Sequence, residues 1–542
     1  MKNLLKKILT FEVPARQENF IINDRNNTVI YDVRKEEFDK KEDIVSDNYD
    51  FNLKYIESRF SYPENNDVVI RKINLKGNIR AFIVFYDGMV DTDMVDLAIV
   101  ETLQKLPFLS EEKISLNADY IMEKLVAHSQ ASATDKFEDI LDEVNFGSCG
   151  LFVEGVEKGF AIDVRKWGNR GIQKPENEQS IYGPQEAFGE MLRNNSALVR
   201  KIIKNEKLIC KAVNVGKISK TRGVLMYISD ITNSDLVNEV ERRLNGIAVD
   251  YIVAVEEVSS LIEEKNMMIT NHILATERPD RVARALAEGR AAFILNGSPR
   301  ALIFPTNAFE LMHAASDSYL RTPYANMTRI IRMAAMFTSV LLPAMYLAIT
   351  LFHQEMVPTF LIFAISAARE NVPFPSIVEL LLMDFSFETI REAGIRMPGP
   401  IGSTLGIVGG LILGQAAVSA KIVSPIMIII IALTGIGSFA VTDYSLSWSY
   451  RILRIIFVVL AAMCGFYGVA IGIFVYAVFL GGQTSFGVPF LAPLAKGRNG
   501  SIGKSIFVSP IWKNEKRPDY LSPKNIKQEP KISIRWKNKR KK

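Results

Sequence analysis

Residues 333–352 read MAAMFTSVLLPAMYLAITLF, twenty consecutive positions without Asp, Glu, Lys or Arg. A helical crossing of the hydrocarbon core of a bilayer requires about 20 apolar residues. Before this stretch, up to about Arg329, charged residues recur every few positions, as they do on a soluble surface. The chain therefore changes solvent near residue 330, and we expect a soluble region followed by membrane helices.

Three further charge-free runs of similar length follow, at Pro398–Ala420, Ile422–Thr442 and Ile455 to about Leu480. Together with residues 333–352 they predict four membrane crossings. The apolar run Met356–Ala368 is too short for an upright crossing, and it fits a re-entrant segment, a tilted helix or half of a hairpin. If it does cross, the charge-free segment Gly482–Ala495 is the candidate that returns the chain.

The formal net charge of +5 comes from one end of the chain. From Lys496 to Lys542 there are 15 Lys and Arg against three acidic residues, so the remainder is net acidic. Such a tail is typical of a retention signal on the cytoplasmic side of the last crossing, or of attraction to anionic headgroups or nucleic acid. We favour the first interpretation and expect no nucleic-acid role. Because Arg321, Arg329 and Arg332 flank the first crossing, both termini are expected in the cytoplasm.

The predicted fold is an α/β soluble N-terminal region of two subdomains followed by an all-α polytopic membrane domain. Residues 1–60 are polar and lack the apolar segment of a signal peptide, which predicts a flexible cytoplasmic lead-in. The following 250 or so residues alternate strand-like and helix-like patterns around a polar loop near Gly168–Pro184. The expected divisions are 1–60, 61–167, 180–315, 328–495 and a basic cytoplasmic tail at 496–542.

The alternating patterns predict individual elements in both subdomains. The expected strands are Val68–Gly77, Ile79–Gly88, Gly150–Glu154, Gly159–Arg165, Leu208–Val215, Val224–Ser229, Ala291–Leu295 and Ala301–Phe304. The expected helices are Asp91–Leu106, Asp135–Val144, Glu186–Ile203, Asp235–Leu244 and Asp280–Ala287.

The sequence contains no motif that supports an enzyme. Cys149, Cys210 and Cys464 are far apart, and no two of the four histidines have the i, i+4 spacing of a metal-binding helix. A phosphate-binding loop, a nucleophile elbow and an H-E-x-x-H pair are all missing from the sequence. We therefore expect no catalytic residue, no cofactor and no metal site.

The third apolar run contains four glycines at a strict spacing of four: Gly402, Gly406, Gly410 and Gly414. Residues four apart share one helical face, so this face allows another backbone to approach closely. Ser403, Thr404 and Gln415 add polar groups, which prefer protein or water to lipid. Two interpretations fit equally well: a helix that lines a pore between subunits, and an ordinary packing contact within one chain.

Three carboxylates, Asp384, Glu388 and Glu392, are also spaced by four, in the amphipathic segment before that helix. If several copies of the chain encircled an axis, they would form rings of negative charge, which admit cations. In the other interpretation the helix lies in the membrane interface with its acids in water. Arg391 stands three residues from Glu388, where a local ion pair is expected to neutralise part of the stripe.

Six short motifs, together with the layout of a soluble region before membrane helices, resemble the A subunits of the GerA-type spore germination receptors over roughly residues 140–495. The chain is similar to this family in all six, in order along the sequence. The motifs are Thr276–Asp280 (TERPD), Thr350–Pro358 (TLFHQEMVP), Arg369–Pro375 (RENVPFP), Arg391–Pro398 (REAGIRMP), Gly414–Val418 (GQAAV) and Phe486–Pro493 (FGVPFLAP).

The resemblance implies a function in the inner membrane of the dormant spore. Such A subunits work with a permease-like B subunit and a lipoprotein C subunit, and they resemble the oligomeric, ion-conducting part of a nutrient-gated channel. That role would fall on the helix at 398–420 and the carboxylate-bearing helix before it. A SpoVAF-like accessory of the dipicolinate channel and a non-conducting scaffold for a permease-like partner are the alternatives.

Overall fold

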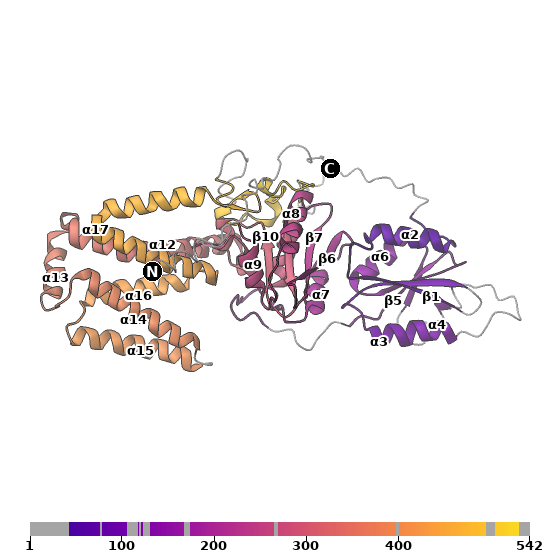
Figure 1. The fold of residues 1–542 in the computed structure, drawn as a ribbon, viewed down its shortest axis with the longest axis horizontal. Helices are drawn as coiled ribbons and strands as arrows, with labels where there is room; N and C mark the ends of the chain where they lie inside the picture. Colours follow the sequence, from indigo (N-terminus) through magenta and orange to yellow (C-terminus); the bar gives the residue numbers. More distant parts are fainter. Residues whose placement is uncertain are drawn as a thin grey trace, which may run out of the picture.

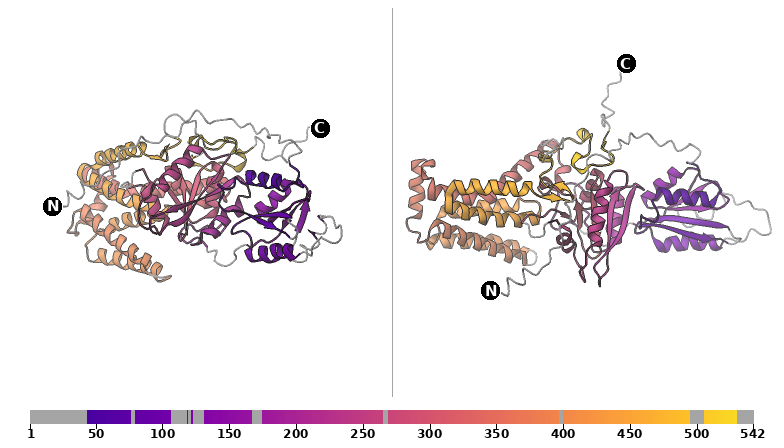
Figure 2. Two further views of the ribbon diagram at one scale, coloured as in Figure 1. Left: turned by 45° about the vertical axis from the view of Figure 1, so that its right-hand side comes forward. Right: turned by 45° about the horizontal axis from the view of Figure 1, so that its top comes forward.

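The computed structural model arranges three parts in line, a small subdomain at one end, a second subdomain in the middle and a helical bundle at the other end (Figure 1). It describes residues 43–75, 79–105, 131–166, 174–264, 269–396, 400–494 and 505–529, together with Ala118, Ile121 and Met122. The views in Figure 2 show the same order of parts. The predicted fold class, a soluble region of sheets and helices followed by a helical region, is thereby confirmed.

The first subdomain is a five-stranded antiparallel sheet with helices on both faces. The inner strand Arg80–Tyr86 is apolar almost throughout, since Phe82 and Val84 face one helical layer while Ala81 and Ile83 face the other. The strands are β1 Val68–Asn74, β2 Arg80–Tyr86, β3 Ala131–Thr134, β4 Cys149–Val153 and β5 Gly159–Ile162, in the order β1-β2-β4-β5-β3. The helices are α2 Tyr49–Arg59, α3 Thr92–Met94, the π-helical turn η1 Val95–Glu101, α4 Thr102–Lys105 and α6 Phe137–Phe146.

The second subdomain repeats this plan. Its strands are β6 Leu208–Val215, β7 Thr221–Ile228, β8 Leu274–Thr276, β9 Ala291–Leu295 and β10 Ala301–Phe304, in the order β6-β7-β9-β10-β8. Counted within each subdomain, both sheets have the strand order 1-2-4-5-3, and all their pairings are antiparallel. Helices α7 Leu192–Ile202 and α10 Pro279–Glu288 cover one face, and α8 Ser234–Asn245 and α9 Val255–Ile262 cover the other.

A buried polar seam joins the two subdomains. The guanidinium of Arg200 in α7 donates to Asn65 at 3.1 Å and to the carbonyl of Leu208 at 2.9 Å. It also donates to Asp67 at 2.7 Å and lies over the ring of Tyr86, 3.9 Å from its centroid. Asp67 and these polar contacts offset the desolvation cost of the buried guanidinium, and they tie the two subdomains together.

The expected boundary at residue 60 is too late. Tyr49–Arg59 forms helix α2, which begins after the capping side chain of Asn48. Leu53, Ile56 and Phe60 are buried in the core of the first subdomain. The many polar residues around them conceal this one apolar face, so composition alone predicts a lead-in where the structure has a helix. Residues 1–42 lie outside the described residues.

The helical bundle carries the predicted membrane runs. Its helices are α12 Thr322–Phe352, α13 Thr359–Arg369, α14 Ser376–Arg396, α15 Pro400–Ser419, α16 Pro425–Phe439 and α17 Tyr444–Gly481, with the short turn η3 Gln354–Met356. The short turns α11 Ala308–Leu311 and η2 Ala315–Ser318 connect the second subdomain to α12. Among the described helices, Thr322–Phe352 is long and apolar enough to cross a membrane, and Ser445–Gly481 meets the same criteria of length and composition when it is counted as one helix. Phe360, Phe385 and Phe474 are each more than two thirds exposed, an apolar surface suited to lipid or to another protein.

Helix α17 is a hairpin of two helices. Gly465 interrupts it with φ +60° and ψ −139°, which is not helical. A Cβ on Gly472 would lie 2.7 Å from the ring of Phe457, although residues 15 apart in one straight helix are about 22 Å apart. The run predicted as one crossing from Ile455 to about Leu480 is therefore two antiparallel helices that meet at Gly465.

The segment after α17 returns to the second subdomain. Strands β11 Thr484–Ser485 and β12 Val488–Pro489 form a small hairpin, and Phe486 and Val488 are buried against the second sheet beside Phe304. Gly482–Ala495 was the candidate for a returning membrane segment. That expectation is wrong for its described residues, because they belong to the core of the soluble region.

The described part of the expected tail, residues 505–529, also packs on the second subdomain (Figure 2). It contains the short turns η4 Ile511–Lys513 and η5 Asp519–Leu521. Tyr520 and Leu521 are buried, and Arg517 donates to the carbonyl of Ala287 at 2.8 Å. This stretch is therefore a folded part of the second subdomain as well as a basic segment. Residues 495–504 and 530–542 lie outside the described residues.

Candidate functional site

The glycine-bearing helix α15 lies at the edge of the bundle, beside α14 (Figure 1). A Cβ on Gly414 would meet Ile428 of α16 at 3.7 Å, which is ordinary packing. By contrast, nothing in the described chain lies within 4 Å of a Cβ on Gly410, and Gln415 is exposed. Of the predicted packing face, the chain itself covers Gly414 and leaves Gly410 open.

The remaining predicted residues of α15 are Gly402, Ser403, Thr404 and Gly406. They belong to the helix, but their side chains lie outside those that the structure describes. A pore role for this face is therefore argued only from Gly410 and Gln415.

Two of the three predicted carboxylates lie inside the bundle and are paired with arginines. Asp384 is 2.8 Å from Nη2 of Arg454, and the same Nη2 donates to Glu388 at 3.1 Å. Glu388 also lies 3.3 Å from Arg391, the local ion pair expected from their spacing. Asp384 and Glu388 therefore do not form a stripe of free negative charge on α14, because arginines of the same chain compensate their charges.

Glu392 differs from the other two carboxylates. It is exposed and pairs with Arg396 one turn further along the same helix, at 2.7 Å. Exposed pairs of this kind contribute little stability, about 0.3–0.5 kcal/mol. Of the predicted ring, Glu392 is the carboxylate that remains near the surface of the chain.

Sequence reasoning missed the arginines that hold this cluster. Arg451 and Arg454 are three residues apart on α17, so they share a face, and both are buried. They directly precede Ile455, the first residue of the last predicted apolar run. Buried charges in an apolar helix require a partner, and that rule could have directed attention to an acidic helix elsewhere.

A second buried pair lies at the opposite end of the bundle. Glu379 is fully buried, 3.5 Å from Arg369, and it accepts the backbone N–H of Ser424 at 3.0 Å. Ser424 is the N-cap of α16, so the carboxylate stands where the helix dipole is positive. This pair fixes the start of α16 against α14.

Ion pairs also fasten the bundle to the second subdomain. Asp317, buried in the turn before α12, accepts from Arg329 at 2.9 Å and from Arg332 at 3.1 Å. Burial opposes ionisation of Asp317, but the hydrogen bond from Arg332 and the two positive charges outweigh it and hold the pKa of its carboxyl below the ordinary value. The carboxylate is therefore the charged centre of the junction.

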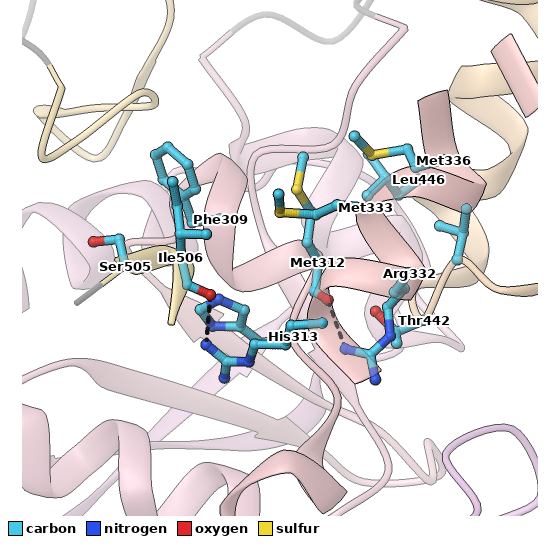
Figure 3. A pocket seen from close by; sticks show the side chains of 12 residues that line it. Phe309, Met312, His313, Arg332, Met333, Met336, Thr442, Leu446, Ser505 and Ile506 are labelled. Atoms are coloured by element: carbon cyan, nitrogen blue, oxygen red, sulfur yellow. Dashed lines mark hydrogen bonds between the residues drawn. The ribbon is translucent and has the colours of Figure 1, made fainter. Parts of the chain in front are cut away.

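A pocket of about 420 Å³, part of it open to solvent, lies at the same junction (Figure 3). Met312, Met333 and Met336 line its apolar side, and His313 and Arg332 are among its polar residues. Burial and the nearby charge of Arg329 lower the pKa of His313 to about 3, so the imidazole is neutral at physiological pH. The pocket is suited to an apolar group. No group of three or more His, Cys, Asp or Glu within the described ranges is placed to hold a metal ion.

A family model and several known proteins match this chain. The family model described as Bacillus/Clostridium GerA spore germination protein matches residues 54–520. Spore germination protein KA of Bacillus subtilis (strain 168) is 36% identical over 470 residues, 86% of each chain. Spore germination protein GerLA of Bacillus cereus is 35% identical over 467 residues, 86% of this chain and 94% of the relative.

Two further relatives extend the comparison. The uncharacterized membrane protein YfkQ of Bacillus subtilis (strain 168) is 34% identical over 462 residues, 85% of this chain and 89% of the relative. A crystal structure of the N-terminal domain of the A subunit of the Bacillus megaterium spore germinant receptor GerK3 is 29% identical, with a TM-score of 0.37. It covers 48% of this chain and 95% of its own. From the family match and the relatives above 30% identity, the chain belongs to the GerA family of spore germination receptor A subunits, which are membrane proteins.

Proposed function

We propose that this A subunit forms, or contributes to, an oligomeric ion channel in the spore inner membrane, and that the channel opens in response to a nutrient and triggers germination. The observation that carries the proposal is the open face of α15 at Gly410. A glycine in an apolar helix leaves a groove that favours close approach of another helix, and the described chain puts nothing there. A second copy of the same helix is the partner that symmetric assembly supplies.

The lining of the proposed channel comes from α15 and from Glu392, not from Asp384 and Glu388. The last two are compensated by Arg391, Arg451 and Arg454, so they offer little free negative charge to a passing ion. The exposed side chain of Gln415 and the exposed carboxylate of Glu392 are two polar groups available on the described part of this edge of the bundle.

The topology proposed here has the α/β region and the tail together in the cytoplasm. Packing of residues 505–529 on the second subdomain supports a common side for both, and the basic residues before α12 favour the cytoplasmic side. The permease-like B subunit and the lipoprotein C subunit are the proposed partners, as the family resemblance implies.

Conductance of the full chain in planar lipid bilayers, alone and with its B and C partners plus nutrient, tests the proposal. The decisive variant is Gly410→Leu, which enlarges the open face at a position where a Cβ meets no described atom within 4 Å. Gly481→Leu is the matched control, since a Cβ on Gly481 also meets nothing within 4 Å. We expect Gly410→Leu to change leak or gating while Gly481→Leu behaves as wild type. A chain that conducts in no combination refutes the channel.

The alternatives make different predictions for the same variants. A non-conducting scaffold would lose only assembly with its partners when Gly410 is enlarged, with no current to change. A SpoVAF-like accessory would require the dipicolinate channel, and not a B and C pair, for any effect in the bilayer.

A further inference from the structure

Five buried or half-buried ionisable side chains meet between α14 and α17, and their charges do not cancel. Arg391, Arg451 and Arg454 supply three positive charges, while Asp384 and Glu388 supply two negative ones. Arginine stays protonated under all protein conditions, so the cluster cannot become neutral by losing a proton from a guanidinium. One positive charge is left over whenever both carboxylates are ionised.

The three guanidiniums also have more N–H donors than the described residues around them have acceptors. Arg391 donates from Nη2 to Ser438 at 2.8 Å. Its Nη1 lies 3.3 Å from Glu388 in an ion pair without hydrogen-bond geometry, and its Nε has no acceptor among the residues that the structure describes. The Nε atoms of Arg451 and Arg454 are also buried without an acceptor in that part of the chain. On the acceptor side, Oδ1 of Asp384 is also buried without a hydrogen bond, although it lies 2.8 Å from Nη2 of Arg454. Buried polar groups are nearly always hydrogen-bonded, so four such donor atoms against one such acceptor in the described cluster point to a missing acceptor.

The three guanidiniums are shielded from bulk solvent. The side chains of Arg391, Arg451 and Arg454 are only 5%, 9% and 2% exposed. Arg391 lies between the rings of Phe387 and Phe439, 4.9 and 4.8 Å from their centroids. Ring faces offset part of a positive charge, but they do not satisfy N–H groups that lie in the plane of the guanidinium.

We propose that this cluster is a binding site for one small monovalent anion, a halide or a carboxylate, held by the guanidinium N–H groups of Arg391, Arg451 and Arg454. The charge matches, because one negative charge brings the cluster to zero. The chemistry matches as well, since guanidinium N–H groups are preferred donors to halides and carboxylates. Because the three side chains are nearly inaccessible, a small diffusible ion fits better than a carboxylate on a partner protein.

The cluster lies toward the end of the bundle that meets the soluble region. Arg391 donates to Ser438 near the end of α16, and four residues later Thr442 donates to the carbonyl of Leu311, which precedes the bundle, at 3.1 Å. The anion site does not depend on the channel proposed above: a chain that conducts no current would still bind the anion.

Thermal unfolding of the full chain in detergent micelles tests the site, with chloride or bromide replacing isethionate at constant ionic strength. Isethionate has the same charge but is too bulky for a site between packed helices. We expect chloride and bromide to raise the melting temperature saturably, by about 2 °C or more at the top of the titration. Equal melting temperatures in all three salts would overturn the proposal without any variant.

Variants then locate the site. Arg391→Gln removes the leftover charge together with its unpaired donors and should abolish the halide-dependent rise, whereas Arg396→Gln on the same helix, in an exposed pair, should preserve it. If Arg391→Gln does not fold, Arg391→Lys retains the charge with fewer donors and should shift the halide midpoint upward about tenfold. A halide effect of wild-type size and midpoint in either Arg391 variant would contradict the assignment.

Discussion

The phenol oxygen of Tyr520 accepts a hydrogen bond from Nη2 of Arg290 at 3.1 Å, across 230 residues of sequence. Asn307 donates to the same oxygen at 3.0 Å, and the phenol donates to Glu310 at 3.1 Å. Burial raises the pKa of Tyr520, so it remains a neutral phenol at physiological pH. The residues after the helical bundle therefore complete the polar core of the second subdomain.

Replacing Tyr520 with Phe should loosen this attachment. The variant keeps the ring but leaves the buried groups of Arg290, Asn307 and Glu310 without their shared partner, at a cost of about 1–3 kcal/mol. Limited proteolysis of the full chain in detergent should cut near residues 505–529 faster, and the melting temperature should fall. Tyr251→Phe, at an exposed tyrosine, is the control and should match wild type in both measurements. Unchanged cleavage in Tyr520→Phe would show that the hydroxyl does not hold the tail.

Asp317→Asn should weaken the junction between the second subdomain and the bundle. The substitution leaves Arg329 and Arg332 partly buried without their carboxylate, and breaking such a pair costs about 3–5 kcal/mol. Its pKa is depressed in the folded chain, so the stabilisation is present above the unfolded value of about 3.9 and is lost as pH falls toward the folded one. Melting temperatures from pH 7 to pH 3 should show wild type well above Asp317→Asn until about pH 4, with the gap closing below. Asp96→Asn, in an exposed ion pair with Arg71, should change little at any pH.

His313 should make the folded chain sensitive to mild acid in a separate pH window. The pKa of His313 is about 3 in the folded chain and about 6.5 in the unfolded chain. Below pH 6 the imidazole is therefore protonated in the unfolded chain but stays neutral in the folded chain. Stability should fall by up to about 1.4 kcal/mol per pH unit between about pH 6 and pH 3. His313→Gln removes this loss. Melting curves of the two proteins should run parallel above pH 7 and diverge below pH 6, and parallel curves down to pH 5 would contradict the assignment.

Much of the soluble fold could be predicted from local pattern. Leu208–Val215, Ala291–Leu295 and Ala301–Phe304 are expected strands with the observed bounds, because each is a short apolar run between polar turns. The edge strands β3 and β8, with sequences ASAT and LAT, carry no such pattern. They are strands because β5 and β10 offer them backbone partners, and a pairing partner distant in sequence has no local signal.

For a related reason, only the carboxylate half of the candidate site could be predicted from the sequence. Spacing alone places Asp384 and Glu388 on one face of α14, and it correctly indicates the ion pair with Arg391. It does not indicate that this face turns inward onto Arg451 and Arg454, since that depends on how α14 and α17 pack. Sequence position also did not indicate that Arg451 and Arg454 belong to the bundle core, because both precede the uncharged run that starts at Ile455.

The reversal of α17 depends on one glycine, and Gly465→Ala should disrupt it. The backbone angles at Gly465 belong to a region that is almost exclusive to glycine, and a Cβ there would lie 2.8 Å from the ring of His353 and 2.9 Å from the Cβ of Phe352. Backbone strain and overpacking together should cost about 2–5 kcal/mol. The melting temperature should fall accordingly, whereas Gly481→Ala, in the same helix but open on all sides, should leave it unchanged.

The geometry of the hairpin can be read directly in the same proteins. Cysteines introduced at Phe457 and Gly472, in a chain with Cys464→Ser, should be joined by a short bifunctional thiol reagent because the hairpin brings the two positions into contact. In Gly465→Ala the yield should drop, since a continuous helix would separate them by about 22 Å. Efficient cross-linking in that variant, with a wild-type melting temperature, would mean that packing against α12 imposes the reversal whatever residue stands at position 465.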